Sequence, residues 1–252
     1  AGITLTVSKG GISNDTVVPF SIEPEVLNYF TVEAAGGGTI GSQDTDNSFD
    51  IEITAYDQYG NVLDAGPNVY NATVDISDTS GSIAPAVSGA LANGFVTQAV
   101  TVTATQAGNV ISVTDTATGT FTGNSNGFNV GPGALSYFFF ETEPVGPYIA
   151  GTGIAVRIQA RDANDNLKTN YTTGAVISDS TGTIAEGGPN SGDTVVAFSA
   201  GVYNAGLAST LFVTQAQAGI TITVSDGAPM VATALTSGIR PATATTAAPP
   251  RE

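Results

Sequence analysis

The feature that most constrains the fold is an internal repeat. Three blocks recur in the same order, at offsets of roughly 100 to 110 residues. Residues 27–30 match 135–138, residues 55–61 match 160–166, and residues 76–84 match 177–185. Several independent blocks at one offset indicate two copies of a structural unit. The chain therefore contains two similar domains of ordinary size.

A third, partial copy lies at the start of the chain. Residues 1–8 read almost as residues 218–225, and residues 22–24 end in proline as residues 130–132 and 239–241 do. We therefore expect residues 1–24 to be the last strands of an incomplete repeat. Residues 25–132 and 133–241 are the two full repeats. Residues 242–252, rich in Ala, Thr and Pro, read as a linker or tail.

Apolar residues alternate with polar ones, which is typical of β-strands with one buried face. Ile51 and Ile53 alternate with Asp50, Glu52 and Thr54. Gly, Pro, Asn and Asp fall between such stretches at roughly 8–12 residue intervals. A repeat of this length with about seven short strands predicts an all-β fold of tandem immunoglobulin-like β-sandwiches with Greek-key antiparallel sheets. Because the chain has no Cys, packing alone has to hold the two sheets together.

The order of these motifs resembles the bacterial immunoglobulin-like repeats of invasin/intimin-type adhesins and of large surface-layer or surface-array proteins. The motifs are Leu-x-Tyr-Phe, a strand that ends in Ala-x-Asp-x-x-Gly-Asn, a Thr-rich strand that ends in Ala-Gly, and Ile-x-Val-x-Asp. The resemblance covers nearly the whole chain. It implies an extracellular protein on the surface of a bacterium or archaeon, in which most repeats act as rigid spacers.

Composition excludes several function classes. The chain has no His and no Cys, so it has no imidazole base, no thiolate nucleophile and none of the usual zinc or haem ligands. Its net charge of −16 opposes binding to nucleic-acid phosphates or to an anionic membrane. Its apolar runs are too short to span a bilayer. We therefore expect no enzyme activity, no nucleic-acid partner and no membrane insertion.

Two acidic loops are candidate Ca²⁺ sites, because Ca²⁺ binds six to eight oxygen ligands. The first offers Asp162, Asn164 and Asp165, and the second offers Asp44 and Asp46. The alternative for the first loop is a hairpin turn in which Asp and Asn cap backbone amides. The alternative for the second is a solvated loop. No other cofactor is expected.

Three Asn-x-Thr triplets, at Asn14, Asn71 and Asn170, are candidate N-glycosylation sites. In a Thr-rich chain such triplets also arise by chance. They matter only where the host glycosylates exported proteins.

The partial repeat also provides candidate assembly residues. Ile3, Leu5 and Val7 would form an apolar face, and an isolated hairpin is only marginally stable. Either a body upstream in a longer native chain covers this face, or another subunit does so by strand addition. The expected partners are therefore copies of the chain or neighbouring immunoglobulin-like domains, arranged end to end.

These observations predict a structural role: a stalk, an adhesin shaft, or a subunit of a filament or surface layer. The alternative is an accessory module of a secreted cell-surface protein that binds carbohydrate or protein, with a surface receptor or polysaccharide as its ligand. Such a module should carry a loop that its sibling repeat lacks. Residues 187–193 are an insertion of this kind, although they are small and polar.

Overall fold

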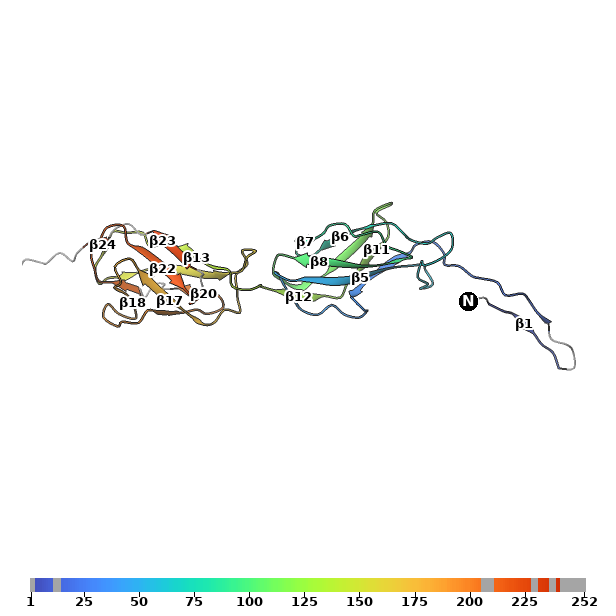
Figure 1. Cartoon of the computed structure of the whole chain (residues 1–252), viewed down its shortest axis with the longest axis horizontal. Helices are drawn as coiled ribbons and strands as arrows, with labels where there is room; N and C mark the ends of the chain where they lie inside the picture. The colour runs from blue at the N-terminus through green and yellow to red at the C-terminus, as the bar shows by residue number, and fades with distance from the viewer. Residues whose placement is uncertain (1–2, 11–14, 205–210, 228–230, 236–238, 241–252) are drawn as a thin grey trace, which may run out of the picture. The chain divides into compact units, whose positions relative to one another are not determined.

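The computed structural model describes residues 3–10, 15–204, 211–227, 231–235 and 239–240 (Figure 1). The chain divides into two compact units, Ala1–Gly131 and Pro132–Glu252, hereafter unit 1 and unit 2. The described residues form strands and turns and contain no helix. Accordingly, no helix in this part of the chain is long and apolar enough to cross a membrane.

Unit 1 is a β-sandwich with two layers. In the first, the strand order is β3-β5-β8-β7, from Tyr29–Ala34, Ser48–Tyr56, Phe95–Val102 and Ile83–Ala84. In the second, β6 (Val74–Asp78), β10 (Ile111–Asp115) and β11 (Thr122–Asn124) pair antiparallel. A further three-stranded sheet has the order β4-β12-β9, from Gln43–Asp44, Phe128–Gly131 and Gln106–Asn109. The β4–β12 pair is parallel, so an early segment closes the sandwich beside the last strand.

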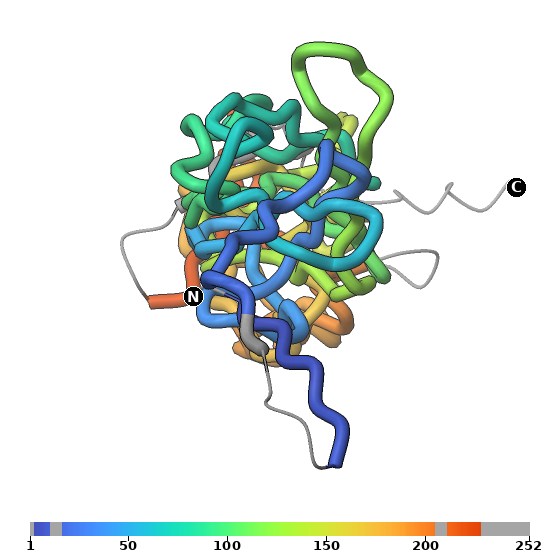
Figure 2. Tube along the Cα trace, turned by 90° about the vertical axis from the view of Figure 1, so that its right-hand side faces the viewer, coloured from blue at the N-terminus to red at the C-terminus, as the bar shows by residue number. Residues whose placement is uncertain are grey.

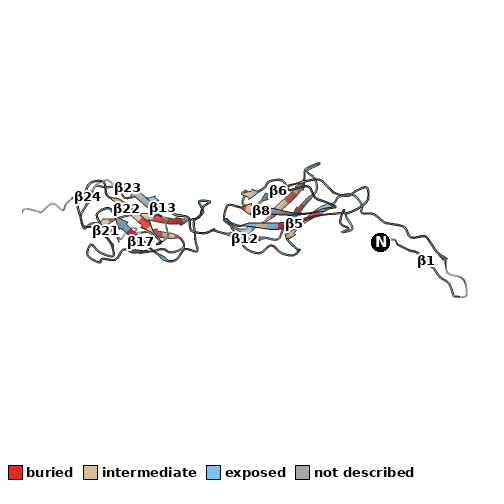
Figure 3. Ribbon diagram, in the orientation of Figure 1, coloured by how far each residue is buried: buried red, intermediate tan, exposed pale blue. Residues whose placement is uncertain are grey.

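The core of unit 1 follows the period-two pattern of its sequence. Ile51 and Ile53 of β5 and Ile111 and Val113 of β10 are all fully buried between the two sheets. Figure 3 shows the buried residues inside the sandwich and the exposed ones along its strand faces and loops. The apolar face of each sheet is thus covered by the other sheet, which is the condition for a stable sandwich.

Unit 2 repeats this arrangement. One three-stranded sheet has the order β13-β16-β20, from Tyr137–Thr142, Arg157–Arg161 and Val202–Asn204. Another has the order β15-β21-β18, from Gly153–Ile154, Leu211–Val213 and Ile184–Glu186. A four-stranded sheet has the order β19-β17-β22-β23, from Val195–Ala197, Gly174–Asp179, Thr221–Ser225 and Val231–Leu235. The short strands β14 (Tyr148–Ile149) and β24 (Ile239–Arg240) pair parallel, as β4 and β12 do.

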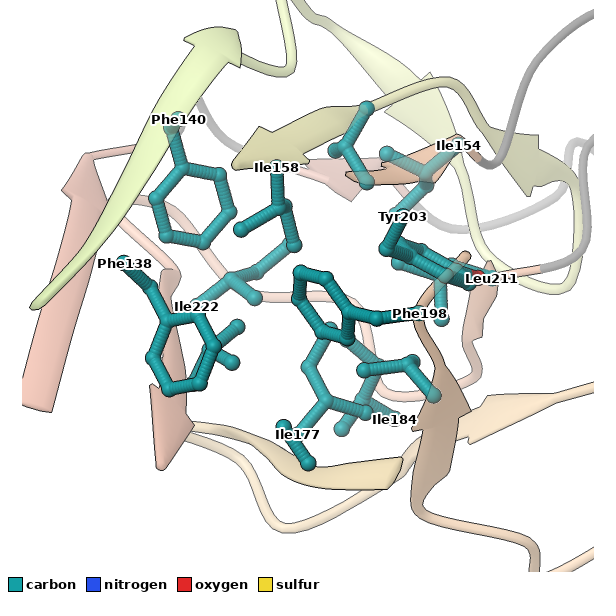
Figure 4. Close-up of a cluster of buried hydrophobic side chains, with 14 of the residues drawn as sticks. Phe138, Phe140, Ile154, Ile158, Ile177, Ile184, Phe198, Tyr203, Leu211 and Ile222 are labelled. Atoms are coloured by element: carbon teal, nitrogen blue, oxygen red, sulfur yellow. The ribbon is translucent and has the colours of Figure 1, made fainter. Parts of the chain in front are cut away.

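Aromatic residues supply much of the unit 2 core (Figure 4). Phe138 and Phe140 of β13 point inward and are 2% and 8% exposed, whereas Phe139 between them is 43% exposed. Phe138 lies against Phe198, with the two ring centroids 5.2 Å apart. The structure therefore confirms the prediction of tandem all-β immunoglobulin-like sandwiches, including the inward and outward alternation.

A two-stranded hairpin precedes the unit 1 sandwich. Its strands are β1 (Thr6–Val7) and β2 (Asp15–Thr16), which pair antiparallel and form a sheet of their own. A further bridge joins Ile3 to Phe20. Ile3, Leu5 and Val7 are 41%, 59% and 78% exposed, so the apolar face expected from the sequence is uncovered in this structure.

Figures 1 and 2 show one loop that projects from unit 1, between β10 and β11. Asp115 at its base is 2% exposed and accepts the backbone amides of Thr118, Thr120 and Phe121 at 2.8, 3.1 and 2.9 Å. Burial raises the pKa of Asp115, but these hydrogen bonds outweigh it and lower the pKa below its usual value. A single buried carboxylate thus organises the whole loop.

Candidate functional site

The strongest candidate site in unit 1 is a buried aspartate in the turn after β5. Asp57 is fully buried, and its carboxylate accepts the backbone amides of Tyr59 and Asn61 at 2.8 and 2.9 Å and the Asn61 side-chain amide at 2.9 Å. It also accepts the backbone amide of Glu25 at 3.0 Å. Glu25 follows the junction proline Pro24, so the carboxylate ties the entering chain to the sandwich.

The turn after β16 does the same in unit 2. Asp162 is fully buried and accepts the backbone amides of Asn164 and Asn166 at 2.9 and 2.8 Å, together with the Asn166 side chain. It also accepts the backbone amide of Gly133 at 3.1 Å, directly after the junction proline Pro132. We call the Asp57 and Asp162 turns, each with its tie to the entering chain, the junction clamps.

Hydrogen bonding determines the charge state of the unit 1 clamp. Burial raises the pKa of Asp57, since a dry site disfavours the carboxylate. The hydrogen bonds from the side chain and backbone of Asn61 and from the amides of Glu25 and Tyr59 outweigh burial and lower the pKa to about 2. Asp57 is therefore ionised at neutral pH, and its hydrogen bonds are of the stronger, charge-assisted kind.

Further side-chain contacts hold each entering segment. In unit 1, the Asn68 side chain donates to the Pro24 carbonyl at 3.2 Å, and the Gln58 side chain donates to the Glu25 carboxylate at 2.5 Å. In unit 2, the Lys168 ammonium donates to the Gly133 carbonyl at 2.5 Å. Both units therefore anchor the entering chain through donors and acceptors of its backbone.

A second aspartate turn also occurs in both units. In unit 1, Asp78 accepts the amides of Ser82 and Ile83 at 2.9 and 3.1 Å, and the Ser82 hydroxyl accepts the amide of Ala104 at 2.9 Å.

The matching turn in unit 2 uses threonine. Asp179 accepts the amides of Thr183 and Ile184 at 2.8 and 2.9 Å, and the Thr183 hydroxyl accepts the amide of Thr214 at 3.3 Å. These hydroxyl clips join the turn after β6 or β17 to the end of β8 or β21. They give the repeated Ile-Ser-Asp block a structural role.

The first calcium candidate lies in the unit 2 clamp. The structure places Asp162, Asn164 and Asp165 in one turn, but their polar groups have different partners. The Asp165 carboxylate accepts from Arg161 at 2.6 Å and from the Tyr137 hydroxyl, while Asp162 is directed at backbone amides. This pattern fits the alternative of a capped turn, and calcium at this turn stays a prediction.

The second calcium candidate lies next to the last strand of unit 1. Asp44 belongs to β4, and both Asp44 and Asp46 are exposed. Between them Thr45 is fully buried, and its amide donates to the Gly131 carbonyl at 3.1 Å. Across the described residues, no group of three or more His, Cys, Asp or Glu side chains is arranged to hold a metal ion.

The glycosylation candidates lie in different settings. Asn71 is exposed, and its side-chain oxygen accepts the amide of Asn93 at 2.9 Å. Asn170 is exposed in a turn before the buried Tyr171. Asn14 lies outside the described residues. Modification at any of the three stays a prediction.

The insertion noted in the sequence borders a surface hollow in unit 2. This hollow has a volume of about 370 Å³ and is lined by Thr183, Ile184, Pro189, Asn190 and Thr214, among others. Glu186 lies nearby, and burial raises the pKa of its carboxyl group, although a hydrogen bond from Tyr203 partly offsets this. The lining is small and polar, with one apolar residue and one proline among those named.

Comparison with known proteins gives similarity in fold. No family model and no curated protein sequence matches the chain. Among solved structures, the FdeC adhesin of Escherichia coli is 17% identical with a TM-score of 0.39, and the match covers 89% of this chain and 68% of FdeC. Domains 4–9 of the surface-layer protein SbsC are 18% identical with a TM-score of 0.31, covering 95% of this chain and 35% of that one.

The intimin fragment solved with the intimin-binding domain of its receptor Tir is 11% identical with a TM-score of 0.30. That match covers 85% of this chain and 64% of the fragment. Two glycoside hydrolases from Bacteroides also match, and there the chain spans 24% and 23% of the matched chains. FdeC and intimin are adhesins, and SbsC is a surface-layer protein. These are the two classes of protein that the sequence motifs resemble.

Proposed function

We propose that the chain is an extracellular structural protein of a bacterium or archaeon. It would serve as a tandem stalk, or as a subunit of a surface filament, adhesin shaft or surface layer. The observation that carries this proposal is the junction clamp, which is built in both units from a fully buried aspartate and the residue after the junction proline.

The clamp suits a protein that carries load along its chain. Tension on the entering segment reaches Glu25 or Gly133 first. The amide of that residue is bound to a carboxylate at the end of β5 or β16, the strand that pairs with β3 or β13. The load therefore passes into the sheet at two points instead of peeling β3 or β13 from its edge. Charge-assisted hydrogen bonds strengthen this attachment.

Electron microscopy of the native material tests the proposal. We would label negatively stained cells and shed material with an antibody against unit 2, with and without a calcium chelator. A structural subunit should give label at regular intervals along rods, filaments or a lattice. Loss of order on chelation would place calcium in the assembly. Label found on soluble particles without such order would contradict the proposal.

The second candidate function is an accessory module that binds carbohydrate or protein, favoured by the hollow beside residues 187–193. Isothermal titration with surface polysaccharides from the source organism would test it. The variant Asn190→Ala should weaken binding if the hollow holds ligand, whereas Asn47→Ala at an exposed position of unit 1 should not. Equal binding by both variants and the unaltered chain would contradict a site in this hollow.

A further inference from the structure

The N-terminal hairpin has the register of a terminal hairpin from a complete sandwich. The matching pairs are Ile3↔Phe20, Thr6↔Thr16 and Val7↔Asp15 in the hairpin, and Asn109↔Phe128, Ser112↔Asn124 and Val113↔Gly123 in unit 1. An individual hydrogen bond also recurs. The amide of Val17 donates to the Leu5 carbonyl at 3.2 Å, as the amide of Ser125 does to the Ile111 carbonyl at 2.9 Å. The hairpin is therefore already shaped as the last two strands of such a domain.

The inward face of this hairpin is uncovered. Phe20 and Ile22 are 41% and 71% exposed, whereas their unit 1 counterparts Phe128 and Val130 are 5% and 4% exposed. Figure 3 shows the hairpin coloured as exposed over residues 3–10 and 17–22. Since a lone hairpin gains little from its own two strands, this apolar face requires a second layer.

The sequence identifies which kind of sandwich would supply that layer. Residues 1–8 and 218–225 are identical at seven of eight positions and differ at Leu5 and Ile222. In unit 2, this segment forms β22, which lies between β17 and β23, and Ile222 and Val224 are fully buried. The matching segment of unit 1, residues 107–114, is far less similar. The first strand of the hairpin thus matches β22, which is followed by β23 in a unit 2-type sandwich.

We infer that the hairpin docks onto an immunoglobulin-like body of the unit 2 type that lacks its own last two strands, and so completes it. The expected register follows from unit 2, where Val224 pairs with Ile177 and Ile222 with Asp179. Val7 and Leu5 should therefore pair with the residues of the partner that correspond to Ile177 and Asp179. A complete second copy of this chain is not the expected partner, because β22 already fills that position in its unit 2.

The test uses the full chain with one extension. A second copy of residues 133–217 is joined to Ala1, so that the hairpin follows an open body in place of residues 218–241. The readout is amide hydrogen exchange of residues 3–8. We expect exchange to slow at least about 100-fold relative to the unextended chain, because docking would make these amides part of a cooperative unit.

Two variants of the extended chain test whether the protection comes from docking of the inward face of the hairpin. Leu5→Asp places a charge on the inward face and should abolish the protection. Thr6→Asp changes the adjacent, outward-facing position and should leave most of it. Equal effects of the two substitutions would overturn the inference. Unprotected residues 3–8 would also overturn the inference, whether or not the added body is folded. In unit 2 the same body folds around residues 218–225, which differ from residues 1–8 at one position.

A further measurement uses the unextended chain. Analytical ultracentrifugation over a wide concentration range should show a monomer with an unprotected hairpin. Concentration-dependent polymers in which residues 3–8 become protected, and which Leu5→Asp abolishes, would show that a second copy is the partner. That result would overturn the assignment to an incomplete body.

Discussion

In unit 1, a stacked tyrosine pair flanks the junction clamp, and a glycine occupies its left-handed position. Tyr29 and Tyr56 lie with ring centroids 5.2 Å apart, and Gly60 has φ +81°. In unit 2, the Tyr56 position is Arg161 and the Gly60 position is Asp165, with φ 68°. Arg161 binds the Asp165 carboxylate and lies over the ring of Phe139, 4.9 Å from its centroid.

This difference separates what the clamp requires from what surrounds it. The buried aspartate, the asparagine four residues later and the tie to the entering chain are present in both units. The outer contacts differ: in unit 1 Tyr29 stacks on Tyr56 beside the glycine, whereas in unit 2 Arg161 and the hydroxyl of Tyr137, the counterpart of Tyr29, bind the aspartate. The inner network therefore defines the turn, and the outer contacts are interchangeable.

The largest expected effect comes from the residue common to both clamps. Asp57→Asn or Asp162→Asn would direct an amide NH₂ at the donors that now bind a carboxylate, which leaves buried donors unpaired. We expect the melting temperature of the altered unit to fall by about 10 °C. Calorimetry would measure the shift, and hydrogen exchange would assign it to a unit. The exposed substitutions Asp64→Asn and Glu143→Gln are the controls, and equal shifts for control and clamp variants would contradict the clamp.

Acid should weaken unit 1 through the same residue. Because the pKa of Asp57 is about 2 in the folded state and about 3.9 in an unfolded chain, its ionisation stabilises unit 1 fully above pH 4. This contribution is lost as the pH falls from about 4 to about 2. Thermal unfolding across this range should show a steeper decline for the unaltered chain than for Asp57→Asn. Parallel declines would show that other carboxylates dominate.

A smaller effect distinguishes the two left-handed positions. Gly60→Ala adds a Cβ where the backbone is left-handed and should destabilise unit 1 by about 1 kcal/mol. The nearest atom to that Cβ is the Tyr29 hydroxyl oxygen at 3.8 Å, so space is not the cause. Asp165→Gly relieves the same conformation but removes the contacts to Arg161 and Tyr137, so we expect almost no change in the free energy of unfolding. Chemical denaturation would measure both, and similar losses would refute the distinction.

A small, salt-dependent effect is expected for the outer ion pair of unit 2. Asp165 is largely exposed, so Arg161→Gln should lower the melting temperature of unit 2 by about 2 °C or less. The difference should shrink in about 1 M salt, where exposed charges are screened. A large effect that persists in high salt would assign Arg161 a packing role over Phe139 instead of an electrostatic one.

Much of the fold could be predicted from the sequence, because strand alternation and the repeated blocks report local geometry. The alternation of inward and outward side chains over residues 137–140 follows directly from the two-residue period of a β-strand. The junction clamp could not be predicted in this way, since Asp57 and Asp162 bind amides 32 and 29 residues upstream. A signal was nevertheless present. Asp and Asn recur in both turns, whereas Asn164 and Asp165 do not, which favours a structural role over a metal site.

The hydroxyl clips have a consequence for how the domains refold. Ser82 and Thr183 join neighbouring segments through hydrogen bonds, in a chain that has no cysteine. Such links need no oxidant and no covalent exchange, so they re-form whenever the strands return to register. A domain built this way can therefore refold from an extended chain without any covalent step beyond its own sequence.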